Sequence, residues 1–136
     1  MKPSRIEHIG IAVTNLESAI NFYEGVMGLE CYKIEEVADQ KVRTAFLMVG
    51  ETKIELLESA DPDGPIAKFI EKRGEGIHHI AFAVEKIEDH LAHAVSMGVK
   101  LIDPVPRRGA EEMDIAFLHP KSAAGVLIEF CEDKKQ

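Results

Sequence analysis

The sequence has few features that would mark a disulfide-stapled, secreted or membrane-spanning protein. It contains two cysteines and no tryptophan in 136 residues. No close cysteine pair suggests a zinc knuckle or a redox dithiol, so we expect two free thiols, with a single disulfide as the alternative. No apolar run approaches the roughly 20 residues that span a bilayer, and the start lacks an apolar secretion segment. We therefore expect a cytoplasmic protein with no membrane partner.

Basic side chains are also in the minority. Sixteen Lys and Arg stand against 24 Asp and Glu, which gives a formal net charge of −8. This balance argues against nonspecific binding to nucleic acid. It does not argue against an anionic small-molecule ligand, because a few local cations can hold one. The length predicts a single domain over 1–136 that is large enough to bury a real core.

The feature that the sequence does have is an internal repeat. Residues 6–13 are Ile-Glu-His-Ile-Gly-Ile-Ala-Val, and residues 77–84, at an offset of 71, are Ile-His-His-Ile-Ala-Phe-Ala-Val. Further matches follow in the same order, 16–17 with 87–88, 27–28 with 97–98 and 54–55 with 128–129. Several matches in one order indicate a duplicated unit.

Each copy is predicted to run strand, helix and then further strands. Alternating apolar residues predict strands, and apolar residues at helical spacing predict helices. Module one covers about 5–59 and module two about 76–132, with a linker helix at about 63–73 between them. The expected strands lie at about 5–13, 42–49, 52–58, 77–84, 113–118 and 125–131, and the expected helices at about 16–27 and 86–97. A capping box starting at Thr14 is expected to begin the first helix.

Strand alternation places one histidine of each copy beside small residues. His8 shares a strand face with Gly10 and Ala12, and His79 shares one with Ala81 and Ala83. Strand alternation also turns Glu55 and Glu129 away from the apolar residues on either side of them. Each glutamate lies in mid-strand, where a buried unpaired charge is costly. If the two modules pair into a curved cup, four groups converge inside it: His8, Glu55, His79 and Glu129.

Two imidazoles and two carboxylates suit a divalent ion such as cobalt, manganese, zinc, nickel or iron(II). A lone strand histidine or glutamate is more often a core or surface residue than a ligand. The symmetry favours the metal site, since a purely structural repeat has no need to keep both polar residues. Of the other histidines, His78 should face away from His79, while His90 and His93 should be solvated. His119 could be structural or could line the site.

Three segments carry a family resemblance: 8–13, 76–81, and 117–122 continuing to 125–129. They resemble the vicinal oxygen chelate superfamily and, within it, the methylmalonyl-CoA epimerases over nearly the full chain. The resemblance implies an α+β fold of two tandem βαβββ modules around one divalent metal ion per chain, and a homodimer. The first two segments are superfamily-specific, whereas the third is close to epimerase-specific.

The implied reaction interconverts the two C2 epimers of methylmalonyl-CoA, on the route between propionate and succinate metabolism. A metal would stabilise the enolate as a Lewis acid, and Glu129 is the first candidate for one of two acid/base groups. In some similar epimerases a glutamate supplies the second, but Thr44 stands there in this chain. Gln40 falls on another position that the family tends to fill. Glu55, a metal-bound water or Glu112 are the remaining candidates for the second base.

The phosphates of CoA need cations. Lys121 is the first candidate, followed by Arg107 and Arg108, which could equally be ordinary loop charges. The main rival function is glyoxalase I, which uses the same ligand set, and the segment 119–122 favours the epimerase over it. A non-catalytic relative that sequesters a ligand, or a dioxygenase, fits the four candidate ligands less well.

Overall fold

The computed structural model describes residues 2–134, which group into two compact units. We call residues 8–78 the first unit, and residues 2–7 together with 79–134 the second unit. Each unit is a four-stranded sheet with its own helix or helices. No helix within residues 2–134 is long and apolar enough to cross a membrane.

The sheet of the first unit has the strand order β2-β3-β4-β1. Its strands are β1 (Arg5–Ala12, of which 8–12 lie in this unit), β2 (Cys31–Val37), β3 (Val42–Val49) and β4 (Thr52–Ser59). β1 runs parallel to β4, and the other neighbours are antiparallel. The helices are α1 (Leu16–Gly25), α2 (Pro65–Arg73) and the short 3-10 turn η1 (Ala38–Gln40).

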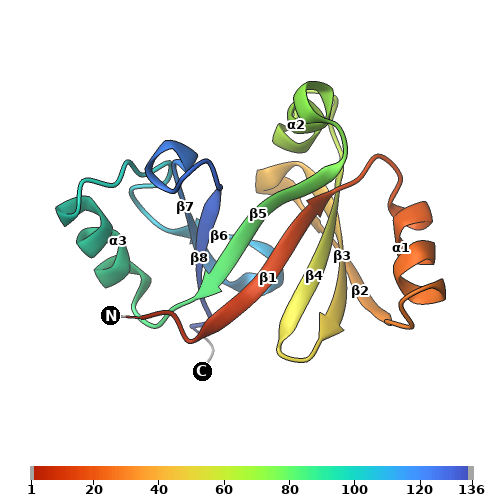
Figure 1. The fold of residues 1–136 in the computed structure, drawn as a ribbon, viewed down its shortest axis with the longest axis horizontal. Coiled ribbons are helices and arrows are strands. Elements are labelled where there is room, and N and C mark those ends of the chain that lie inside the picture. Colours follow the sequence, from red (N-terminus) through yellow and green to blue (C-terminus); the bar gives the residue numbers. More distant parts are fainter. Residues whose placement is uncertain (1, 135–136) are drawn as a thin grey trace. The chain divides into compact units, whose positions relative to one another are not determined.

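Helix α1 covers one face of this sheet (Figure 1). The buried residues beneath α1 are Val13, Leu16, Ala45, Leu47 and Leu56. The cap of α1 is Asn15, whose side chain accepts the N–H of Ser18 at 2.9 Å. The prediction of a capping box at Thr14 is therefore wrong. Thr14 instead donates hydrogen bonds from its N–H and its hydroxyl to Glu75.

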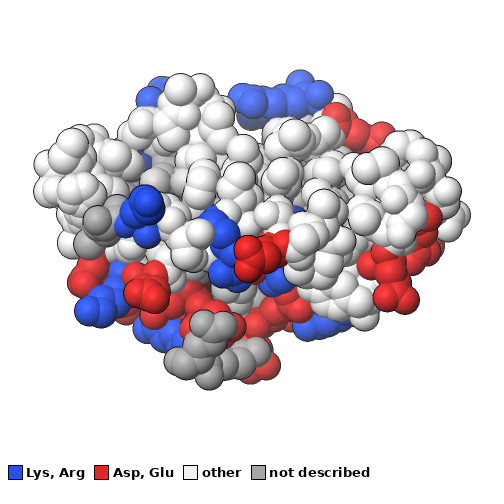
Figure 2. Space-filling view, turned by 60° about the horizontal axis from the view of Figure 1, so that its bottom comes forward, with Lys and Arg blue, Asp and Glu red and all other residues white. Residues whose placement is uncertain are grey.

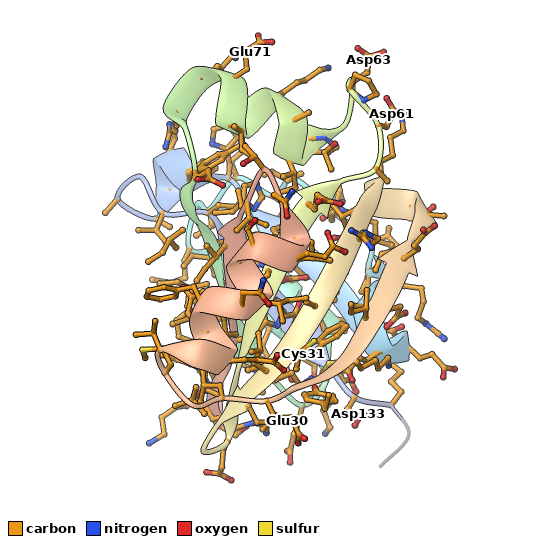
Figure 3. The ribbon with its side chains drawn as sticks, turned by 90° about the vertical axis from the view of Figure 1, so that its right-hand side faces the viewer. Glu30, Cys31, Asp61, Asp63, Glu71 and Asp133 are labelled. Carbon is orange, nitrogen blue, oxygen red and sulfur yellow. The ribbon has the colours of Figure 1, made fainter. Side chains whose placement is uncertain are left out.

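The chain enters α2 through a tight acidic turn. Asp61 accepts the N–H of Asp63 at 2.8 Å, and Pro65 begins the helix, where a missing N–H is harmless. Figure 3 shows Asp61 and Asp63 in this turn and Glu71 on α2. The predicted linker helix at 63–73 is thus present and starts two residues later.

The sheet of the second unit has the equivalent order β5-β8-β7-β6. Its strands are β5 (Gly76–Ala83, of which 79–83 lie in this unit), β6 (Arg107–Arg108), β7 (Asp114–Leu118) and β8 (Ile128–Glu132). β5 is parallel to β8, as β1 is to β4. Helix α3 (Ile87–Ser96) packs on the face formed by β7 and β8, and the turns η2 (Ala110–Glu112) and η3 (Pro120–Ser122) complete the unit.

The predicted α+β fold of two βαβββ modules is confirmed. β8 begins at Ile128 and not near 125, because a turn occupies the preceding residues and Gly125 has a φ of +87° there. β6 lies in the segment between α3 and β7, where no strand was predicted. The strand β2 was expected from the module pattern but was not placed by the sequence.

The two cysteines agree with the sequence-based expectation, whereas His90 does not. Both cysteines are free, as predicted; Cys31 lies half-buried at the start of β2 beside Glu30 (Figure 3), and Cys131 is buried in β8. The expectation that His90 is solvated is wrong. Its exposed fraction is 9%, and its ring packs edge-on against Phe130 at 5.4 Å.

Both units anchor the start of their main helix in the same way. Glu58 of β4 accepts the N–H of Leu16 at 2.8 Å, and Glu132 of β8 accepts the N–H of Ile87 at 2.9 Å. In the first unit Arg43 also binds Glu58, at 3.1 Å. These carboxylates compensate N–H groups that a helix start leaves without partners. The last strand of each module thereby fixes its helix on the sheet.

Candidate functional site

The first unit contains a buried histidine–glutamate pair. His8 Nδ1 lies 3.0 Å from Glu55 Oε2, and each residue has an exposed fraction of 5%. The register explains the meeting, because Glu55 stands beside Gly10 on β1 and beside Phe46 on β3. Gly10 has no side chain, so the two polar groups have room on the face opposite α1.

The second unit repeats this arrangement. His79 Nε2 lies 3.0 Å from Glu129 Oε1, and the two residues have exposed fractions of 5% and 3%. Glu129 stands beside Ala81 on β5 and beside Phe117 on β7. Each histidine therefore lies beside the glutamate of its own unit, and the convergence of all four groups stays a prediction.

The chemistry of each pair suits a divalent cation. An imidazole nitrogen and a carboxylate oxygen are the donors that zinc, cobalt, manganese, nickel and iron(II) accept. A carboxylate buried this deeply is costly unless a hydrogen bond or a cation compensates its charge. The donor atoms of His8 with Glu55, and of His79 with Glu129, therefore fit a metal ion.

An aromatic ring and a guanidinium group lie beside the His79–Glu129 pair. The Phe117 ring lies edge-on to His79, with ring centroids 5.4 Å apart. Arg107 also contacts this ring, with its guanidinium carbon 5.8 Å from the Phe117 centroid. Asp103 holds Arg107 at 3.2 Å and accepts the N–H of Phe117 at 2.8 Å. This chain of contacts helps to fix the position of the His79 ring.

The remaining candidates of the second unit occupy its turns. His119 caps η3, where its Nδ1 accepts the N–H of Lys121 at 3.1 Å, which gives it a structural role. Lys121 is exposed, and its ammonium forms no ion pair with any residue in 2–134. Arg108, in contrast, lies 3.5 Å from Asp114, and Glu112 is an exposed residue 4.0 Å from Arg108.

The candidates of the first unit lie on two elements. Thr44 is buried on β3, with an exposed fraction of 1%. Gln40 is half-buried at the end of η1, between β2 and β3. His78, predicted to face away from His79, packs edge-on against Phe69 of α2, with centroids 4.9 Å apart.

Sequence reasoning missed the aromatic neighbours of the two glutamates. Phe46 and Phe117 take equivalent places beside Glu55 and Glu129. The signal was present, because Ala-Phe-Leu at 45–47 recurs at 116–118 with the same offset of 71 as the histidine strands. A complete search for that offset would have found both rings.

Comparison with known proteins places the chain in a family. The family model described as the glyoxalase/bleomycin resistance protein/dioxygenase superfamily matches residues 7–117. An uncharacterised Bacillus subtilis protein, YqjC, is 44% identical over 96% of this chain and 94% of its own length. The ethylmalonyl-CoA/methylmalonyl-CoA epimerase of Cereibacter sphaeroides is 38% identical over 92% of this chain and 95% of its own length.

A solved structure agrees with these sequence matches. A variant of the Streptomyces coelicolor methylmalonyl-CoA epimerase, in complex with 2-nitronate-propionyl-CoA, is 36% identical and covers 98% of this chain and 96% of that one, with a TM-score of 0.94. Its fold, together with the matched family model and the duplicated histidine–glutamate pairs, leaves one conclusion. The chain belongs to the glyoxalase/bleomycin resistance protein/dioxygenase superfamily, in which its characterised relatives include methylmalonyl-CoA epimerases.

Proposed function

We propose that this protein interconverts the (R) and (S) epimers of methylmalonyl-CoA by removing and returning the proton at C2. The observation that carries the proposal is the buried histidine–glutamate pair, which occurs once in each unit of a chain whose relatives include epimerases of this substrate. The C2 proton lies between a thioester and a carboxylate. Its removal therefore produces an enolate whose negative charge the site must stabilise.

The proposed metal ligands are the two pairs acting together. His8 and Glu55 would supply one half of the coordination shell, and His79 and Glu129 the other, for one divalent ion per chain. Cobalt, manganese, zinc and nickel all accept this nitrogen and oxygen set. When bound, the ion supplies Lewis-acid stabilisation of charge on the substrate oxygens. The two carboxylates offset the charge of the ion, which makes its burial tolerable.

Epimerisation needs proton transfer on both faces of C2. We assign Glu129 to one face and Glu55 to the other. One carboxylate takes the C2 proton while the C–H electron pair enters the enolate, and the other, in its protonated form, returns a proton from the opposite side. Both groups are deeply buried, and this limits proton loss to bulk water.

The binding of the substrate is assigned to residues on both units. Lys121 is the first choice for the CoA phosphates, because it is exposed and forms no ion pair within residues 2–134. Arg107 and Arg108 are second choices, because each already binds an aspartate. Gln40 and Thr44 are proposed to contact the acyl part of the substrate.

The proposal extends to the setting of the enzyme. We infer a homodimer in the cytoplasm, working between propionate and succinate metabolism.

On the face drawn in Figure 2, acidic and basic side chains lie close to one another, and the net charge is negative. An anionic CoA ester must therefore be held by individual cations such as Lys121. Gel filtration combined with light scattering tests the dimer.

The test of the function is deuterium exchange at C2 of methylmalonyl-CoA in heavy water. Purified protein is stripped with a chelator and then assayed alone and with added cobalt. Rapid exchange that depends on the metal supports the proposal. A fully metallated protein that catalyses no exchange overturns it, and activity on the glutathione hemithioacetal of methylglyoxal would then assign the glyoxalase I function instead.

A single variant tests the assigned acid/base role. Glu129→Gln keeps the size of the side chain but removes its ability to take a proton, so we expect a loss of at least about a hundredfold in exchange, in the range that general acid–base catalysis contributes. Glu85→Gln is the matched control, since Glu85 is an exposed residue just after β5. Equal activity of the two variants would exclude Glu129 from the proton transfer.

A further inference from the structure

The hydroxyl of Thr44 is buried without a hydrogen-bond partner in the part of the chain that the structure describes. Thr44 has an exposed fraction of 1%, so bulk water does not supply the missing hydrogen bond. A buried hydroxyl that lacks a partner is costly, because it gives up its hydrogen bonds to water and gains none in return. Such a group calls for an explanation, since most buried polar atoms in proteins are satisfied.

Strand register places Thr44 on the face that carries the first histidine–glutamate pair. Thr44 stands opposite Leu57, and Phe46, two residues further along β3, stands opposite Glu55. Residues two apart on a strand point to the same face, so Thr44 and Glu55 are diagonal neighbours on one face. The intervening Ala45 points the other way, into the core under α1.

The second unit shows that the fold itself does not require a hydroxyl there. Phe117 is the counterpart of Phe46, so the counterpart of Thr44 is Ile115, which stands opposite Cys131 on β8. Ile115 is also buried, with an exposed fraction of 2%, and packs in an apolar cluster. The two modules thus accept an apolar side chain at this place in one copy and hold a hydroxyl in the other.

We propose that the Thr44 hydroxyl donates a hydrogen bond to the free carboxylate of the malonyl-type acyl group. The carboxylate of Glu55 lies 3.0 Å from His8 and accepts no hydrogen bond from the Thr44 hydroxyl, so this donor is left for a ligand. A substrate carboxylate is an acceptor-only group and matches an unused donor. The inference rests on the proposed function and makes Thr44 a binding group that takes no part in proton transfer.

The reaction places a limit on what Thr44 can do. A threonine hydroxyl hardly ionises at neutral pH, so it cannot take the C2 proton. Its contribution is to hold the substrate carboxylate, and with it the orientation of C2, on the face of the sheet that bears Glu55. The contact would distinguish acyl-CoA esters that have a free carboxylate from those that lack one.

The experiment compares Thr44→Val with Thr44→Ser. Valine keeps the shape and removes the hydroxyl, and we expect it to raise the melting temperature while lowering kcat/KM for C2 exchange by about tenfold, as for a lost charge-assisted hydrogen bond. Serine keeps the hydroxyl and should restore most of that loss. A structural role predicts no such opposition between stability and activity.

Titration calorimetry with two esters separates this inference from the function on which it rests. Thr44→Val should weaken the binding of methylmalonyl-CoA but leave that of propionyl-CoA, which has no free carboxylate, unchanged. If the wild-type protein catalyses no exchange, the proposed function fails, and the calorimetry alone decides the role of Thr44. Equal affinities of wild type and Thr44→Val for methylmalonyl-CoA, or no binding to either protein, would overturn the inference.

Discussion

Replacement of Glu132 by alanine should destabilise the protein by about 2 kcal/mol, as for a lost hydrogen bond to a charged group. Glu132 accepts the N–H of Ile87 in the first turn of α3 at 2.9 Å. The N-cap residue Lys86 makes no side-chain cap and has a φ of +56°. A hydrogen bond to a charged group contributes about 1.5–3 kcal/mol, and a carboxylate at a helix start adds about 0.3–1 kcal/mol. Because Glu132 is half-buried, we place the sum near the lower end of this range.

Glu132→Gln separates the hydrogen bond from the charge. The amide oxygen of glutamine can still accept the N–H, so the variant loses only the charge and should cost about 0.5–1 kcal/mol. Urea unfolding followed by circular dichroism measures both free energies. The expected order of stability is wild type, then Glu132→Gln, then Glu132→Ala.

Glu85→Ala serves as the control, because this exposed residue should change the free energy of unfolding by less than about 0.5 kcal/mol. Amide exchange gives a local test as well. The Ile87 amide should lose protection in Glu132→Ala and keep most of it in Glu132→Gln. If Glu132→Ala is as stable as the control, or if glutamine costs as much as alanine, the capping argument is refuted.

Three further predictions concern pH, metal and substrate. Burial lowers the pKa of His90, so the native state keeps a neutral imidazole while the unfolded chain takes up a proton near a pH of about 6.5. The free energy of unfolding should therefore fall as the pH drops below about 6.5. This fall should be less steep in His90→Leu and as steep as in the wild type in the exposed control His93→Gln. Urea midpoints measured across this pH range give the comparison. Chelation should lower the melting temperature, and excess cobalt should restore it; no shift with added ion would contradict the metal site. Lys121→Ala should raise KM for methylmalonyl-CoA several-fold with little change in kcat, and an unchanged KM would remove Lys121 from the phosphate contacts.

The strand faces of the two histidines and the two glutamates could be predicted from the sequence because strand alternation is a local property. Once 5–13 and 77–84 are taken as strands, the side-chain period of two fixes which residues share a face with each histidine. The same rule sets Glu55 and Glu129 apart from their apolar neighbours. In the structure each histidine lies 3.0 Å from the glutamate of its own unit. That all four groups bind one ion is a prediction, because it depends on more than the pairing within a module.

The glutamate contacts at the two helix starts could not be predicted, because they join residues distant in sequence, and neither could the short strand β6. Glu132 meets Ile87 across 45 residues, and a two-residue strand at 107–108 has no periodicity to detect. His90 is different, because its burial was predictable. Ile87, His90, Leu91 and Ala94 are the buried residues of α3, which is the spacing of an apolar helix face. The charged neighbours of His90 in sequence lie on other sides of the helix.

Duplication supplies a comparison inside one chain that separates structural from functional requirements. The glutamates at 58 and 132 recur in both modules and do the same structural task twice. A position where the copies differ in polarity, while the fold stays the same, needs a reason beyond the fold. Ile115 packs in an apolar cluster at the place where Thr44 leaves a buried hydroxyl unsatisfied. Because a module can be built with isoleucine at that place, stability does not explain the threonine, whereas a ligand that accepts a hydrogen bond from its hydroxyl would.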